Sequence, residues 1–186
     1  MTIKSIALFV HVVGVLTLFT ALAVERVAVE LLRGTGGESP PSVALRLLRG
    51  LPRFTGTAVA LILLSGIPMA ARFGVLRSAW VLVSFAAMIL MAGLGNAALR
   101  PLFRSTGPVG ASGGWRARAS RPFLDVSLRM RVGVALAIVY LMVAKPDFLA
   151  ATAVVIVGLV AGAVASVVFT RTPVATASTE EASRTV

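Results

Sequence analysis

The chain contains no cysteine, a single histidine and few charged residues. Of its 186 residues only 13% are charged and 6% are aromatic, whereas about 25% of residues are charged in an average soluble protein. Without cysteine the chain can form no disulfide, no thiolate metal site and no thiol redox centre. These absences exclude zinc-finger and iron–sulfur proteins, and the low charge content argues against a water-soluble fold.

What the chain does have is long apolar stretches. Hydrophobic residues make up 58% of the sequence, and a helix needs about 20 apolar residues to cross about 30 Å of hydrocarbon. Stretches with few or no charges cover residues 3–24, 54–71, 79–99, 132–144 and 148–170. We therefore predict an all-α, multi-pass membrane protein: one domain, residues 1–170, with five transmembrane helices, and a flexible cytoplasmic tail at 171–186.

The basic residues behind the net charge of +11 are grouped in particular connections between the apolar stretches and are not spread over one face of a folded domain. Basic residues are dense after the first stretch and after the third: Arg33, Arg46, Arg49 and Arg53, then Arg100, Arg104, Arg116, Arg118, Arg121, Arg129 and Arg131. Because basic loops stay in the cytoplasm, we expect the N-terminus outside and the C-terminus inside a bacterial inner membrane. Anionic lipids would gather at the inner face, and nucleic acid is not an expected partner.

The ends of the stretches allow finer predictions. Lys4 and the following apolar run resemble a secretory leader, but the run continues to Leu32, which favours an uncut first helix. Glu25 and its charged neighbours should project into the headgroup zone. A short interfacial helix is expected at 43–51, before a restart at Pro52, and the polar stretch from Arg100 to Arg131 should be a loop.

Small and polar residues indicate where helices pack. Gly158, Gly162 and Ser166 recur at four-residue intervals, a stripe that lets another backbone approach closely. Asn96 is costly in lipid and should hydrogen-bond to another helix. The stripe predicts association, within the chain or with other membrane protein subunits.

His11 is the residue most suited to chemistry. A neutral imidazole inside a span can bind haem iron, copper or the magnesium of a chlorophyll-type pigment, or relay protons. It can equally be a structural histidine that hydrogen-bonds to the next helix. Candidate second ligands at a similar depth are Met69 and Met142, although methionines in apolar helices are usually core filler, as expected for Met88 and Met91.

Three segments together carry a family resemblance. They are the run from Leu8 to Leu16 around His11, Trp80 at the start of the third stretch, and the run from Arg131 to Lys145-Pro146. They resemble small bacterial predicted integral membrane proteins related to the copper-resistance protein D group. The resemblance implies a recurring helix-one histidine, matched by His11, and copper handling for some members. The chain lacks the additional histidines and methionine clusters that copper transport would need, and its fifth helix is an addition.

Two functional hypotheses remain. No catalytic triad, phosphate-binding loop or facing carboxylate pair is evident, so an enzyme is not expected. The first hypothesis is a structural or accessory subunit of a larger membrane complex. The alternative is a haem- or copper-binding membrane module that uses His11. A channel or transporter is less favoured, because no charge is expected near the bilayer centre.

Overall fold

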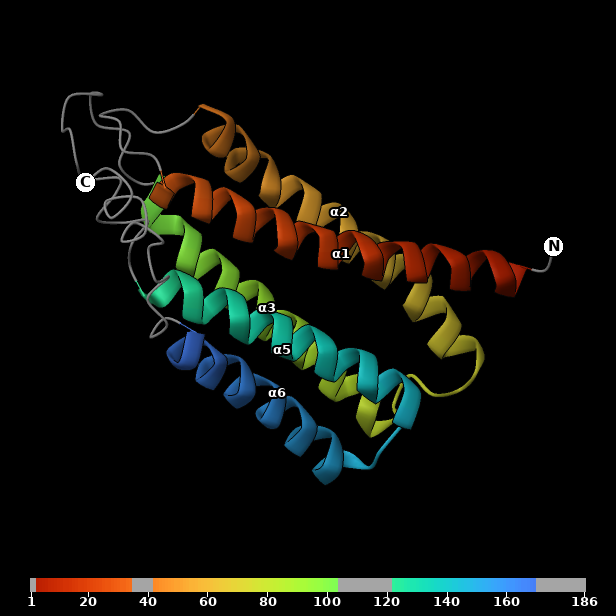
Figure 1. Cartoon of the computed structure of the whole chain (residues 1–186). Helices are drawn as coiled ribbons and strands as arrows, with labels where there is room; N and C mark the ends of the chain where they lie inside the picture. The colour runs from red at the N-terminus through yellow and green to blue at the C-terminus, as the bar shows by residue number, and fades with distance from the viewer. Residues whose placement is uncertain (1–2, 35–41, 104–121, 170–186) are drawn as a thin grey trace, which may run out of the picture.

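The computed structural model describes residues 3–34, 42–103 and 122–169, and every long element in these ranges is an α-helix (Figure 1). The helices are α1 (Ile3–Gly34), α2 (Ser42–Arg72), α3 (Ala79–Phe103), α5 (Pro122–Ala144) and α6 (Phe148–Phe169). All 5 are long and apolar enough to cross a membrane, and a helix satisfies its own backbone hydrogen bonds where no water is present. The predicted all-α, multi-pass membrane fold is confirmed. The predicted tail, 171–186, lies outside the described residues.

A tight turn joins the last two helices. Lys145, Pro146 and Asp147 separate α5 from α6, and Lys145 has a positive φ of 48°. The side chain of Asp147 accepts a hydrogen bond from the backbone N–H of Ala150 at 2.9 Å, which caps the start of α6. The short turn brings α6 back antiparallel to α5 (Figure 1).

The predicted separate helix at 43–51 is wrong. The stretch is the first part of α2, which continues through Pro52 and Pro68 to Arg72, since neighbouring groups can satisfy the backbone that a proline frees in a membrane helix. Leu48 and Leu51 are buried and pack in one cluster with Leu32 of α1. The apolar face of this segment therefore covers protein instead of lying on the lipid surface.

The fourth membrane helix begins earlier than predicted. The charges before residue 132 pointed to a loop, yet α5 starts at Pro122, a residue favoured in the first helical turn. Asp125 and Arg131 are ion-paired with α1, and Arg129 donates a hydrogen bond to a carbonyl of α6. Charges that are paired inside the protein do not prevent a segment from being a membrane helix.

The helices form two groups that meet along a limited interface. α1 packs along α2, and α5 packs against both α3 and α6, whereas contact between the groups is mainly between α1 and α5. Figure 1 shows the groups close together where α1 ends and apart toward the N-terminus of α1. We refer to them as the α1–α2 hairpin and the α3–α5–α6 group. The space between them holds the candidate sites.

Candidate functional site

His11 lies on α1 and its ring reaches α2. Its Nδ1 atom is 3.2 Å from the carbonyl oxygen of Ile62 and 3.3 Å from the hydroxyl oxygen of Ser65. The Ser65 hydroxyl itself donates to the carbonyl of Leu61 at 2.5 Å, so its oxygen is left to accept. Because a carbonyl oxygen can only accept, Nδ1 carries the proton and Nε2 has the free lone pair.

Two glycines allow α1 and α2 to approach closely at this point. A Cβ atom on Gly66 would lie 3.0 Å from His11 Cε1, and one on Gly14 would lie 2.9 Å from Ile62 Cγ1. Missing side chains of this kind let membrane helices pack backbone to backbone. Neither these glycines nor Ser65 were predicted from the sequence to belong to the site, although Gly14 lies three residues after His11 and hence on the same helix face.

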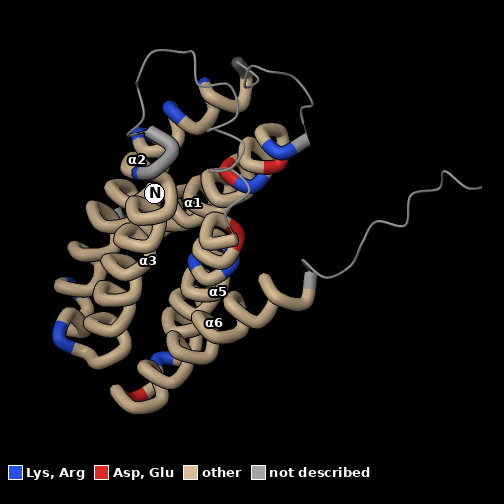
Figure 2. The backbone as a smooth tube through the Cα atoms, turned by 90° about the vertical axis from the view of Figure 1, so that its left-hand side faces the viewer, with Lys and Arg blue, Asp and Glu red and all other residues tan. Residues whose placement is uncertain are grey.

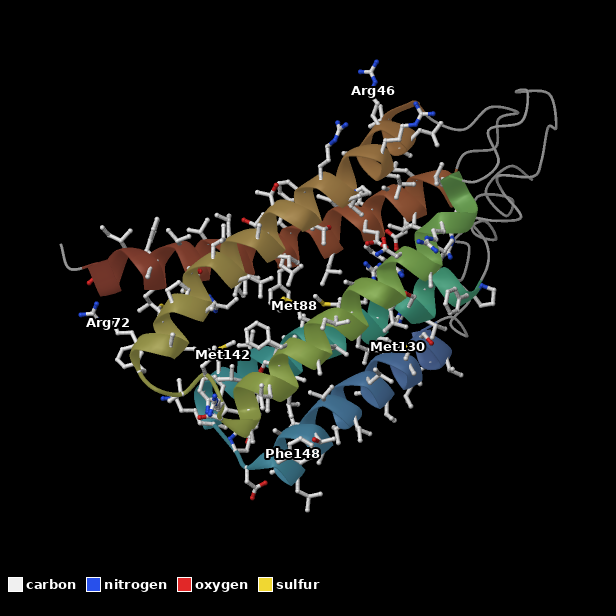
Figure 3. The ribbon with its side chains drawn as sticks, turned by 180° about the vertical axis from the view of Figure 1, so that it is seen from behind. Arg46, Arg72, Met88, Met130, Met142 and Phe148 are labelled. Carbon is white, nitrogen blue, oxygen red and sulfur yellow. The ribbon has the colours of Figure 1, made fainter. Side chains whose placement is uncertain are left out.

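A cavity of about 560 Å³ lies between the hairpin and the α3–α5–α6 group, and we call it the His11 cavity. It is lined by His11, Met69 and Met142, the three residues proposed from the sequence as metal or cofactor ligands, and also by Met88 and Lys145. Figure 3 shows Met88 and Met142 in the space between the two groups. The volume of the His11 cavity lies within the range of about 300–1,000 Å³ that is usual for ligand sites.

The nitrogen and sulfur groups of the His11 cavity set its possible chemistry. In the described part of the chain, no three His, Cys, Asp or Glu side chains come together as a metal site. A metal ion in this cavity would therefore be bound by Nε2 of His11 with thioether sulfurs. Imidazole nitrogen and thioether sulfur are ligands of copper(I) and of haem iron.

A buried charge cluster, missed from the sequence, joins the two groups at their other end. Glu25 on α1 forms an ion pair with Arg131 on α5, and their side chains are only 3% and 6% exposed. Arg26 and Arg33 of α1 each lie 2.8 Å from the carboxylate of Asp125. Figure 2 shows the acidic and basic positions of α1 and α5 beside each other. Glu25 is therefore buried against α5 and does not point out into the surroundings of the protein.

The signal for this cluster was present in the sequence. Glu25 and Asp125 are carboxylates within otherwise apolar helices, and such a charge needs an opposite partner. Arg26 also pairs with Glu30 one turn later at 2.7 Å, the spacing seen in the sequence. The sequence could not show that the partners come from distant helices. Glu25 and Arg131, for example, are 106 residues apart in the chain.

The small-residue stripe of α6 packs inside the chain. A Cβ atom on Gly158 would lie 2.6 Å from the carbonyl oxygen of Gly133, and one on Gly162 would lie 2.7 Å from Met130 Cα, both on α5. Ser166 is buried and its hydroxyl donates to the carbonyl of Ala163 at 2.6 Å. The Gly158 and Gly162 positions are thus occupied by α5 and are not free for a partner subunit.

Asn96 makes no interhelical hydrogen bond within the part of the chain that the structure describes. Its side chain is exposed and has no hydrogen-bond partner among the described residues. It lies instead at the edge of a second, smaller cavity. The amide is therefore available to bind something else.

No protein-family model, curated protein or solved structure matches this chain. The resemblance to proteins related to the copper-resistance protein D group thus stays a prediction. Any function must be inferred from the fold and from the chemistry of the two cavities.

Proposed function

We propose that the protein is a bacterial inner-membrane module that binds a haem or a copper ion at His11. The observation that carries the proposal is the state of the imidazole. Nδ1 donates a hydrogen bond to the Ile62 carbonyl on α2. His11, Met69 and Met142 line the same cavity. Metal-bound histidines almost always donate their second ring N–H to a carbonyl or carboxylate, which orients the ring and fixes the tautomer.

The hydrogen bond to α2 is also what a purely structural histidine would make. The cavity separates the two cases, because a structural histidine requires no space beside it. Among the described residues Nε2 has no hydrogen-bond partner, and the lining is apolar except for groups such as Ser84 and Lys145. A histidine that lines an apolar, ligand-sized cavity is the arrangement expected for cofactor binding.

Cofactor binding can be measured on the isolated protein. Protein purified in mild detergent should carry about one haem, detected as a Soret absorption band, or should bind about one copper(I) ion in a competition titration with a chelator. His11→Ala should lose the haem or weaken copper binding by at least about a hundredfold, since it removes a ligand. Met69→Leu and Met142→Leu should shift the spectrum or weaken binding less.

The control is Met130→Leu, because Met130 is half-buried on α5 and does not line the His11 cavity. It should behave as the wild type does. A wild-type protein that neither carries haem nor binds copper(I), even after haem or copper is supplied, would contradict the proposal. So would a His11→Ala variant that binds like the wild type.

An accessory subunit of a larger membrane complex is the second candidate. The small-residue stripe no longer supports it, because Gly158 and Gly162 are packed on α5. In its favour, α6 contacts mainly α5 and leaves a broad apolar face with Ile156, Val160 and Val164 exposed. Purification after crosslinking in native membranes distinguishes the two: a stable stoichiometric partner favours the subunit, and a monomer with bound cofactor favours the module.

A further inference from the structure

A second cavity, about 260 Å³ in volume, lies near the buried charge cluster. Its sides are α2, with Thr55 and Gly56, and α3, with Asn96. Glu25 of α1 and Arg131 of α5 lie at its base. It shares no lining residue with the His11 cavity, and Glu25 is about 21 Å further along α1 than His11 at 1.5 Å per residue. The two cavities are separate sites.

This second cavity opens sideways between α2 and α3. These two helices make almost no contact with each other, and Gly56, Ala92 and Asn96 of the lining are exposed, whereas Glu25 and Arg131 are buried. In a membrane protein, an opening between two spans faces the lipid. The occupant would therefore enter from the bilayer.

Three residues that line the cavity carry polar groups without a hydrogen-bond partner among the described residues. Nε of Arg131 is the one buried side-chain nitrogen or oxygen in the described part of the chain that has no hydrogen-bond partner. Neither the Thr55 hydroxyl nor the Asn96 amide has a partner among the described residues. A buried donor without an acceptor costs about 1–3 kcal/mol, so an oxygen atom supplied by a ligand would be stabilising.

The charge of the site selects among ligands. Arg131 is compensated by Glu25, with which it forms an ion pair, so the base of the cavity has no net charge and gives little attraction to an anion. The remaining walls are apolar and include Leu22, Val59 and Met91. A neutral headgroup with acceptor oxygens and an apolar tail matches both properties, whereas a phosphate does not.

We propose that this second cavity binds the headgroup of a neutral, carbonyl-bearing, lipid-soluble molecule of the quinone class. A side-chain N–H of Arg131 and the amide N–H of Asn96 donate to carbonyl oxygens of the ring, and the apolar tail leaves between α2 and α3. The proposal is independent of His11.

The test is the binding of decylubiquinone to the protein in detergent, measured by isothermal titration calorimetry. Gly56→Leu places a side chain at the mouth of the cavity. The structure has nothing within 4 Å of a Cβ atom at Gly56, so the variant should fold. Gly93→Leu on α3 is the matched control, since Gly93 is also exposed, has nothing within 4 Å and does not line the cavity.

We expect saturable binding of one decylubiquinone, weakened at least about tenfold by Gly56→Leu and by Asn96→Leu, and changed less than about twofold by Gly93→Leu. Short-chain phosphatidylglycerol should compete poorly. The proposal is overturned by a wild type that shows no saturable binding, by a Gly56→Leu variant that binds as the Gly93→Leu variant does, or by phosphatidylglycerol that competes as well as the quinone.

Discussion

Arg131 and Glu25 place two opposite charges inside an apolar interface. Their side chains are almost fully buried, and they connect the α1–α2 hairpin to the α3–α5–α6 group. The two groups also meet in an apolar cluster that includes Leu32, Leu99 and Leu124. Gly95 makes room for the guanidinium, because a Cβ atom at this position would lie 2.8 Å from Nη1 of Arg131. The pair thus holds the two groups together at this end along with the ion pairs of Asp125.

Removing one partner should cost far more stability than removing both. Arg131→Met leaves the Glu25 carboxylate buried without a counter-charge, which costs about 3–5 kcal/mol. The double variant Glu25→Gln, Arg131→Met contains no buried charge at this position and should be clearly more stable than Arg131→Met alone. The measurement is the thermal unfolding midpoint in detergent for the wild type, both single variants and the double variant.

Two results would contradict this role of the pair. One is an Arg131→Met protein as stable as the wild type. The other is a double variant no more stable than the Arg131→Met single variant, which would mean that the arginine acts through its other contacts.

At the scale of elements, α5 and α6 approach each other backbone to backbone at three glycines. The glycines at 133, 158 and 162 bring the two backbones into contact. In membranes such close packing replaces the hydrophobic effect as the source of helix association. The position of α6 therefore depends on these glycines remaining without side chains.

Glycine-to-alanine substitutions should change the stability of the protein differently at different positions. Gly162→Ala puts a methyl group against the backbone of Arg129 and Met130 and should destabilise the protein by about 1–3 kcal/mol, the usual cost of overpacking. Gly93→Ala meets nothing within 4 Å and should leave stability unchanged or raise it by up to about 1 kcal/mol through helix propensity. Unfolding in detergent measures both. Equal effects of the two substitutions would contradict the packing of α6 on α5.

The same elements show how far the sequence could predict the fold. α3 and α6 agree with their apolar stretches because few charges interrupt them. The start of α5 was missed because Asp125, Arg129 and Arg131 fall in the stretch that was predicted to be a loop, and only the tertiary structure shows their partners. The separate interfacial helix was predicted wrongly because an apolar face such as that of 43–51 can cover protein as well as lipid, and here it packs on α1.

The candidate site was predicted in part for a related reason. Depth along a helix follows from residue number, so His11, Met69 and Met142 could be placed at a common level. Which face each side chain occupies relative to the other helices does not follow, and so the roles of Ser65 and Gly66 beside the imidazole became visible only in three dimensions.

At the scale of the whole molecule, the sites depend on how many times the chain crosses the membrane. Five helices are long enough to cross, and five crossings would put the two termini on opposite sides. The His11 cavity would then lie toward the side of the α2–α3 connection, and the buried charge cluster toward the side of the arginine-rich connections. The distribution of arginine predicts that the latter side is cytoplasmic.

Labelling of introduced cysteines tests this topology most directly, because the natural chain has none. Single cysteines at Arg77 and Asp147 should react with a membrane-impermeant maleimide in intact cells. Cysteines at Arg46 and Ser178 should react only after the inner membrane is permeabilised. Labelling of all four positions in intact cells, or of Arg46 and Ser178 on opposite sides, would contradict the five-span arrangement on which both proposed sites depend.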